Sequence, residues 1–304
     1  MKVTVGIPSI LRKTLENTLR CLSKQSYKNF DIILVYKGEL RESVKRFNRK
    51  LKISFIEQKE GFLEEAYNEI LKISDSDLLL FTDDDACPSP TWVEDHVQFH
   101  DKNPKVGVAG GIVHGKIWKN YPNYAYELFK GSELMEEADE AFKEYVGYLT
   151  KTGLSVDRGM HKNNEKTLAV AGVNMSVKKP AYEGFQAYTY SIFASYIETQ
   201  ISLNALKRGY DSVRFPKAYV YHKKLFSLSV PTKQNERKLI IEKYSFPYIA
   251  DKFYKLDQNL LQLLAIKMTG YPQLGLCAAL RGLKETVRPN EFRKILLETY
   301  NSVS

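Results

Sequence analysis

The sequence predicts an α/β fold with a doubly wound, mostly parallel, Rossmann-like sheet and a helical extension at its carboxyl end. Three observations support this prediction. Short apolar runs alternate with segments of helical periodicity in the first part of the chain, as expected for right-handed βαβ units. One of these runs ends in three adjacent aspartates, at the strand end where open α/β sheets place their ligands. Beyond residue 226 the apolar residues follow helical spacing alone.

The first part of the chain alternates strands with helices. Strands are expected in four short apolar runs, each closed by proline, glycine or charged residues: 3–7, 30–36, 53–56 and 78–82. Helices are expected where apolar residues recur at helical spacing: 12–24, 40–50, 60–73 and 91–100. The first ~90 residues are therefore expected to form a nucleotide-binding half-domain.

The middle of the chain is less regular. Further elements are expected as four strands and one helix: strands at 106–113, 168–177, 213–216 and 218–222, and a helix at 198–208. Residues 116–168 lose a clear period, and we interpret them as an insertion that covers the site as a lid. Their length and polarity argue against a place in the core.

The last segment, 226–304, has two alternative interpretations. Basic residues interleave with its apolar ones. Helices that pack on the preceding domain explain this pattern, and so does a peripheral contact with an anionic membrane surface. No run of ~18 apolar residues predicts a spanning helix, and no signal-peptide pattern is present. We therefore expect a cytoplasmic location, at the cytoplasmic membrane face in the second case.

Composition narrows the classes of function. The 304 residues suit one large or two modest domains, and the formal net charge of +9 suits phosphate-bearing substrates, an anionic membrane or nucleic acid. No nucleic-acid partner is expected, because the lysines are scattered and no helix-turn-helix, zinc or RNP pattern appears. Cys21, Cys87 and Cys277 are odd in number and widely spaced, so we expect neither a disulfide framework nor a zinc site, and favour a reducing compartment.

The run Leu78–Thr82 has the length and composition of a buried strand, and Asp83, Asp84 and Asp85 follow it directly. Three adjacent carboxylates repel one another unless a positive charge lies among them. A Mg²⁺-type cation that holds a substrate diphosphate is the simplest explanation. The alternative is a solvated acidic turn that caps the next helix.

Seven segments resemble, in order and spacing, the motifs of the family 2 glycosyltransferases of GT-A fold: 3–9, 30–38, 60–68, 81–85, 171–177, 197–203 and 215–222. The order of the motifs carries the resemblance, because each motif alone is common.

The resemblance implies a GT-A catalytic domain at 1–225. Residues 1–115 are then the half that binds a nucleotide sugar, and residues 116–225, with the insertion at 116–168, are the acceptor half. Residues 226–304 form the helical region beyond it. The implied activity is an inverting, metal-dependent transfer of a sugar from a nucleoside-diphosphate sugar to a hydroxyl of a glycan, lipid-linked or protein acceptor.

By the same resemblance, Asp85 binds a divalent metal, Mn²⁺ or Mg²⁺. Asp83 and Asp84 contact the nucleoside ribose or support the ion. Asp83 is a further metal contact, and His222 is a further metal or diphosphate contact. The alternative for His222 is an imidazole at a strand end that binds nothing.

Pro8 and Ser9 match the loop that holds the nucleotide base in the family. Gly61 matches a glycine at a helix start where a side chain would crowd the nucleotide. The sequence departs from the family pattern at Lys37, where the family usually carries an aspartate that contacts the base. Lysine cannot accept a hydrogen bond, so the identity of the nucleotide stays open.

Glu198 stands at the position of the family's aspartate base, which takes the proton of the acceptor hydroxyl. Ile197 replaces the acid that usually precedes it. The alternative role for Glu198 is an acid in the first turn of a helix, where the helix dipole favours it. Asn174, Met175 and Trp118 are expected on the acceptor side.

Two hypotheses other than an active glycosyltransferase remain for a chain with these motifs. A sugar-phosphate nucleotidyltransferase needs a glycine-rich phosphate loop after the first strand, and residues 8–13 contain no glycine. A catalytically inactive glycosyltransferase-like binding protein would explain the departures at Lys37 and Ile197. The retained acids at 83–85, with Glu198 and His222, favour an active enzyme.

Overall fold

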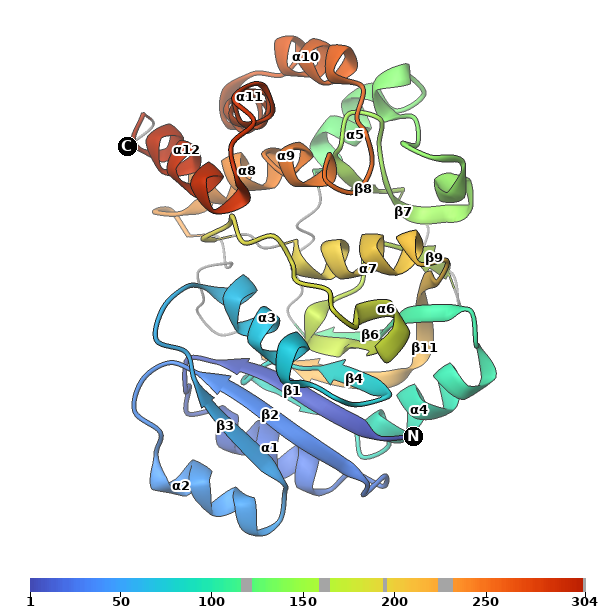
Figure 1. Cartoon of the computed structure of the whole chain (residues 1–304), viewed down its shortest axis with the longest axis vertical. Coiled ribbons are helices and arrows are strands. Elements are labelled where there is room, and N and C mark those ends of the chain that lie inside the picture. Colours follow the sequence, from blue (N-terminus) through green and yellow to red (C-terminus); the bar gives the residue numbers. More distant parts are fainter. Residues whose placement is uncertain (116–121, 159–164, 194–195, 224–231, 303–304) are drawn as a thin grey trace.

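The computed structural model describes residues 1–115, 122–158, 165–193, 196–223 and 232–302. Figure 1 shows a sheet with helices on its faces in the amino-terminal half, and a layer of carboxyl-terminal helices stacked above it. The predicted α/β class, the mostly parallel sheet and the helical carboxyl-terminal part are confirmed.

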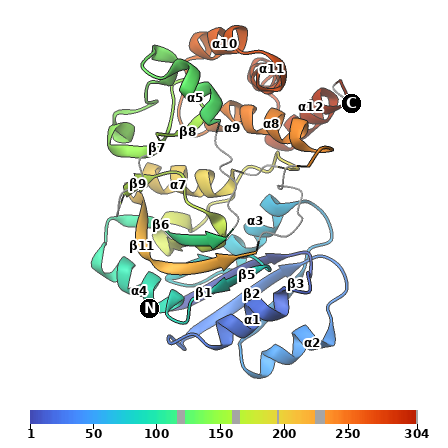
Figure 2. The same ribbon diagram turned by 180° about the vertical axis from the view of Figure 1, so that it is seen from behind.

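The strands are β1 (Val3–Ser9), β2 (Phe30–Tyr36), β3 (Ile53–Glu57), β4 (Leu78–Phe81), β5 (Ala86–Pro88), β6 (Val106–Gly115), β7 (Tyr145–Leu149), β8 (Ser155–Asp157), β9 (Glu165–Thr167), β10 (Met175–Lys178) and β11 (Asp211–His222). They form one sheet in the order β3-β2-β1-β4-β10-β6-β11-β9-β7-β8. The first four strands are parallel, β10 is antiparallel to β4 and β6, and β11 is parallel to β6. Figure 2 shows β11 with β5, which pairs antiparallel to its end.

The helices are α1 (Leu15–Ser23), α2 (Glu42–Lys45), α3 (Leu63–Ile73), α4 (Trp92–Lys102), α5 (Asn123–Phe129), α6 (Lys179–Tyr182), α7 (Ile197–Lys207), α8 (Glu236–Tyr244), α9 (Pro247–Ala250), α10 (Gln258–Lys267), α11 (Gly270–Lys284) and α12 (Pro289–Asn301). One apolar core joins α1 and α4 to one face of the sheet, and a second joins α3, α6 and α7 to the other. The sheet is therefore covered on both faces, which explains the continuous apolar runs of β1, β2 and β4.

The end of β1 differs from the prediction that Pro8 and Ser9 break the strand. Both residues stay in β1, where Pro8 pairs with Val35 of β2 and Ser9 with Tyr36. On its other side β1 pairs with β4 only as far as Gly6. Pro8 therefore lies where β1 has become an edge, and an edge tolerates a residue without a backbone N–H.

The prediction that residues 116–168 lie outside a core is wrong for the part that the structure describes. Side chains of this segment, among them Phe142, Tyr148 and Leu149, are fully buried against carboxyl-terminal residues such as Phe246 and Leu264. The segment forms short strands and 3₁₀ turns, so its apolar residues have no long period that a sequence could reveal. The carboxyl-terminal helices therefore pack on the rest of the protein, and the described part of residues 116–168 is the segment on which they pack.

The expectation of no disulfide is also wrong. Cys21 of α1 and Cys87 of β5 form a disulfide, with Cα atoms 5.6 Å apart. The two residues are 66 positions apart in sequence, and only the packing of α1 against β5 brings them together. Cys277 is free and exposed.

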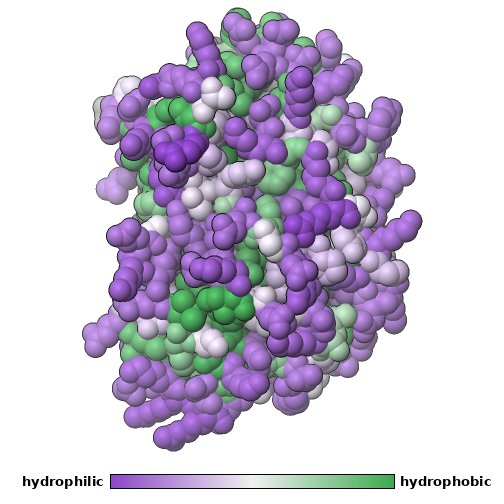
Figure 3. Space-filling view, viewed as in Figure 1, coloured by the Kyte–Doolittle hydropathy of each residue, from purple (hydrophilic) through white to green (hydrophobic). Residues whose placement is uncertain are grey.

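The carboxyl-terminal helices turn mostly hydrophilic residues to the face in Figure 3. Their apolar side chains lie mainly inside, in the core that they share with residues 123–157. None of the described helices is both long and apolar enough to cross a membrane.

A buried polar chain crosses the core beneath β10. The Asn174 side chain donates to the Ile112 and Ala218 carbonyls (2.9 and 2.7 Å). Its Oδ1 lies 2.7 Å from Trp92 Nε1 and 3.0 Å from His96 Nε2.

The chain continues through Ser176 Oγ, which lies 2.8 Å from both His96 Nδ1 and His100 Nε2. Burial lowers the pKa of His96 to about 4 and lowers that of His100 well below its usual value. Both rings are therefore neutral in the folded protein near neutral pH.

Acidification is expected to lower the free energy of unfolding of the wild-type protein more than that of a His96→Gln variant. The folded-state pKa of His96 lies below its unfolded value of 6.5, so its contribution is complete above pH 6.5 and is lost as the pH falls toward 4. The free energy of unfolding should fall by about 2 kcal/mol relative to the variant between about pH 6.5 and 5. Urea unfolding at both pH values measures this difference, and parallel changes in the two proteins would contradict it.

Candidate functional site

The predicted site residues come from several elements that end at the same edge of the sheet. Asp83, Asp84 and Asp85 follow β4, Ser9 ends β1 and His222 ends β11. Parallel strands deliver their carboxyl ends to one edge, so residues far apart in sequence meet there.

Asp83, Asp85 and His222 form a cluster with the composition of a metal site. Each offers one ligand atom, and these atoms lie within 4.8 Å of one another. His222 Nε2 is 3.1 Å from Asp85 Oδ1 and 3.5 Å from Asp83 Oδ2. Two carboxylates and an imidazole suit a divalent cation, and a cation there would relieve the repulsion between the acids.

The electrostatics of Asp83 agree with this crowding. Burial, with the neighbouring Asp85 and Asp84 carboxylates, raises the pKa of Asp83 to about 6, against the opposing effects of His222 and Arg12.

Asp84 does not face the open site. Its side chain is fully buried and accepts hydrogen bonds from Ser9 Oγ (2.7 Å) and from the N–H groups of Ile10 (3.2 Å) and Arg12 (3.4 Å). It also forms an ion pair with the Arg12 guanidinium. Asp84 thus anchors the loop after β1, in which Leu11 adopts a φ of 57°. Its role in contacting the nucleoside ribose or supporting the ion stays a prediction.

Pro8 and Ser9 are themselves buried at the start of this loop. The Ser9 hydroxyl donates to Asp84 and accepts from the Leu11 N–H at 2.8 Å. Their side chains therefore shape the loop, while the following Ile10 is exposed.

Gly61 lies in the loop before α3, with a φ of 89° that disfavours any other residue. A β-carbon there would lie 2.6 Å from Cγ of Glu65. The Lys37 ammonium donates to the Gly61 carbonyl and lies 5.8 Å from the Phe62 ring. Lys37 thus holds this loop.

Glu198 lies in the first turn of α7 and is half-buried. Its carboxylate lies so close to Gly172 that a β-carbon there would overlap it. Burial raises the pKa of Glu198 to about 7, and repulsion from Asp83 adds to this, while Lys243 and the Gly172 N–H oppose it. The charge of Asp83 is therefore felt at Glu198, and Glu198 can gain or lose a proton near neutral pH.

Two of the residues predicted for the acceptor side lie inside the protein. Asn174 and Met175 are fully buried, and the Asn174 side chain is engaged in the polar chain beneath β10. Their place on the acceptor side stays a prediction. Trp118 lies outside the described residues.

Two charged residues near the site were missed by the sequence analysis. Arg12 had a weak signal, because it is basic and lies three residues after the end of the first strand. Lys243 of α8 had none, because it lies among many other lysines in the tail. Burial lowers the pKa of Lys243 to about 8, and its ammonium lies 4.3 Å from the centre of the Tyr196 ring.

A model of glycosyl transferase family 2 matches residues 4–168. No curated protein matches the chain.

Three solved structures are similar to the chain. Residues 1–349 of S. aureus TarS in complex with UDP-GlcNAc are 13% identical, with a TM-score of 0.57 over 93% of this chain and 81% of that one. The mannosyltransferase PcManGT from Pyrobaculum calidifontis, in complex with GDP-Man and Mn²⁺, is 15% identical, with a TM-score of 0.56 over 99% and 79%. A longer S. aureus TarS structure is 15% identical with a TM-score of 0.53 over 88% of this chain, which spans 42% of its length.

Proposed function

The chain belongs to glycosyl transferase family 2, and from this premise we propose that it transfers a sugar from a nucleoside-diphosphate sugar to an acceptor hydroxyl. The proposed reaction needs a divalent metal and inverts the anomeric carbon. One observation carries the proposal: Asp83, Asp85 and His222 converge at one point, and the ionisable Glu198 lies within electrostatic reach of Asp83. These observations support a single site in which a centre suited to a diphosphate would lie near a base.

Asp83, Asp85 and His222 would hold the metal through two carboxylate oxygens and one imidazole nitrogen, with Mn²⁺ or Mg²⁺ as the ion. When bound, the ion supplies the positive charge that stabilises the departing diphosphate. The complex of PcManGT with GDP-Man and Mn²⁺ supports this choice for a protein of the same fold.

Glu198 would take the proton of the acceptor hydroxyl as the acceptor oxygen attacks the anomeric carbon. The new carbon–oxygen bond forms on the face opposite the diphosphate, and the old one breaks with its electron pair on the phosphate oxygen. A single displacement of this kind inverts the configuration. A pKa of about 7 makes Glu198 both ionised and basic near neutral pH.

The nucleotide would lie between the loop after β1 and the loop that contains Gly61. Lys37 donates to the Gly61 carbonyl and so holds this loop in place. Because Lys37 cannot accept a hydrogen bond from a base, the base of the nucleotide stays open between uridine and guanosine. The acceptor would be a hydroxyl of a glycan, a lipid-linked sugar or a protein.

A metal-dependence assay tests the proposal. Purified protein is incubated with a panel of nucleoside-diphosphate sugars that includes UDP-GlcNAc and GDP-Man, with Mn²⁺, Mg²⁺ or EDTA, and release of the nucleoside diphosphate is measured. We expect slow release from at least one donor with a metal and none with EDTA. A thermal-shift measurement should show stabilisation by the same donor, because a ligand that binds only the folded state stabilises it. Absence of both release and stabilisation with every donor and metal would overturn the proposal.

A further inference from the structure

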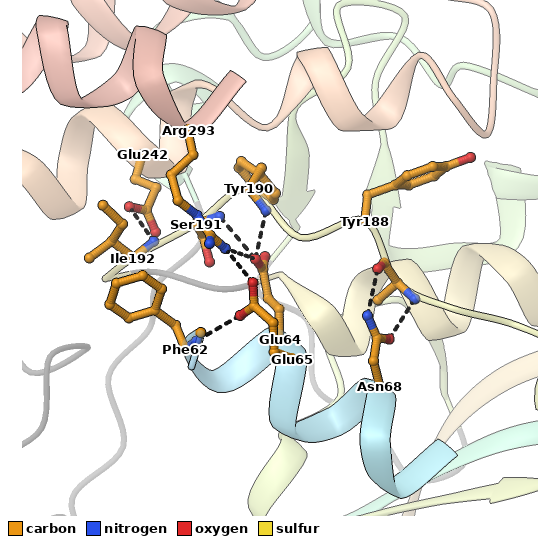
Figure 4. A network of polar contacts seen from close by, with 12 residues as sticks. Phe62, Glu64, Glu65, Asn68, Tyr188, Tyr190, Ser191, Ile192, Glu242 and Arg293 are labelled. Carbon is orange, nitrogen blue, oxygen red and sulfur yellow. Dashed lines mark hydrogen bonds and ion pairs between the residues drawn. The ribbon is translucent and has the colours of Figure 1, made fainter. Parts of the chain in front are cut away.

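A strap of residues 187–193 runs between α3 and the carboxyl-terminal helices, and side chains hold it through its backbone (Figure 4). Asn68 of α3 donates to the Ala187 carbonyl (2.9 Å) and accepts from the Ala187 N–H (2.8 Å). Gln200 of α7 makes the same pair of contacts with Tyr188, at 3.1 and 2.8 Å. The start of the strap is therefore tied to two helices.

Two buried carboxylates hold the rest of the strap. Glu64 of α3 accepts the N–H groups of residues 190 and 191 at 2.7 and 2.9 Å. Glu242 of α8 accepts those of residues 192 and 193, both at 3.0 Å. Both carboxylates have no exposed surface. Acids buried in this way depend on donors and on nearby positive charge.

Arg293 of α12 brings positive charge to this cluster. Its Nη2 lies 2.9 Å from Glu65 Oε1 and 3.5 Å from Glu64 Oε2. Its guanidinium lies 5.0 Å from the centre of the Phe62 ring. The side chain is only 19% exposed, so these contacts lie largely out of water and are screened less than surface pairs.

The contacts of Arg293 continue into the loop before α3, residues 60–62, which we call the donor loop. Glu65 Oε2 accepts the Phe62 N–H at 2.7 Å. Arg293 therefore holds this loop twice, through Glu65 and through the Phe62 ring. The same guanidinium holds the strap through Glu64.

The strap leads toward the candidate base. After residue 193 the chain reaches Tyr196 within three positions, and α7 follows with Glu198 in its first turn. Gln200 also bonds Tyr188 of the strap, so the helix that carries Glu198 is tied directly to the strap. The distance between the donor loop and Glu198 therefore depends on the positions of the donor loop and of the strap.

We propose that Arg293 is a positioning residue that holds the donor loop and the strap in one arrangement, so that α12 helps to set the distance between the nucleotide sugar and the base. The effect on catalysis rests on the proposed function. The family match ends at residue 168, so Arg293 and the strap both lie beyond it.

An Arg293→Gln variant tests the inference against an Arg281→Gln control. Arg281 forms ion pairs with Glu285 and with Glu298 of α12, but it is exposed on the outer surface of the helical layer. We expect faster hydrogen–deuterium exchange in both the donor loop and the strap for Arg293→Gln alone. We also expect its donor KM to rise roughly tenfold and its kcat to fall roughly 10–100-fold, because small misplacements of reacting groups are costly.

An Arg293→Lys variant keeps the test decisive if Arg293→Gln does not fold. Lysine retains the charge near Glu65 but cannot reproduce the planar contact with Phe62 while serving both carboxylates, so it should restore kcat and KM only in part. Exchange that stays unchanged in either segment, or kinetics equal to those of Arg281→Gln, would overturn the inference. If the wild-type protein shows no metal-dependent turnover, the proposed function fails, and the exchange data still decide whether Arg293 holds both segments.

Discussion

Replacing Glu198 with glutamine is expected to lower the rate of sugar transfer by roughly 10²–10⁴-fold, the usual contribution of a positioned base. Glutamine has nearly the same shape, so the contact with Gly172 and the binding of the donor should persist. It cannot take a proton from the acceptor. The measurement is kcat for transfer, together with a thermal shift by the donor and metal.

The pH dependence of the wild-type enzyme should report the same group. Glu198 must be ionised to act, and its pKa is raised to about 7, so kcat/KM should rise with pH and reach half of its maximum near that value. This rising limb should vanish in Glu198→Gln. A variant that keeps normal transfer with an unchanged pH profile would show that another group is the base. Glu183→Gln is a suitable control, because Glu183 is exposed just after α6.

Replacing Asp85 with asparagine is expected to abolish metal-dependent release of the nucleoside diphosphate. Asp85 is the most buried residue of the triad Asp83, Asp85 and His222, and its Oδ1 lies 3.1 Å from His222 Nε2. An amide oxygen carries no negative charge, so it binds a hard divalent cation more weakly than a carboxylate does. Stabilisation of the protein by Mn²⁺ alone should also be lost, and this readout needs no substrate.

An Asp101→Asn variant is the matched control for that experiment. Asp101 is an exposed acid at the end of α4, which leads into the start of β6, whereas the triad lies at the carboxyl ends of the strands. Its response to Mn²⁺ and its turnover should equal those of the wild type. Retention of stabilisation by Mn²⁺ in Asp85→Asn would remove Asp85 from the metal site, even if turnover were lost.

Much of the sheet could be predicted because its signal is local. The runs that form β2 and β4 are apolar on both faces, and such runs are typical of strands covered by helices on each side. The acidic triplet could be recognised in the same way, since it directly follows β4. The sequence could not show which aspartate turns inward. Asp84 does so because it binds Arg12 and the loop after β1, and these residues lie more than seventy positions before it in the sequence.

The errors share a different cause. Residues 123–157 looked polar and irregular because their apolar side chains sit on short elements, yet they are buried by helices from the other end of the chain. The hydrogen bonds of Asn174 could not be predicted either: it matched an acceptor-site motif, and in the structure its amide bonds Trp92, His96 and two carbonyls in the core. A polar residue in a motif carries no sign of whether its partner is a ligand or the protein itself.

The sequence by itself determined the fold class, the family and the acids at 83–85, because strand periodicity and motif order are properties of neighbouring residues. The family resemblance already implied that Asp83 and Asp85 meet His222, and the structure brings their ligand atoms within 4.8 Å of one another. Only the tertiary structure decided that Asp84 anchors a loop and that Arg293 reaches α3 from the last helix. These are contacts between distant segments. They depend on how the sheet and the helical layer pack, since the partner that satisfies a charge or a hydrogen bond is chosen by proximity in space.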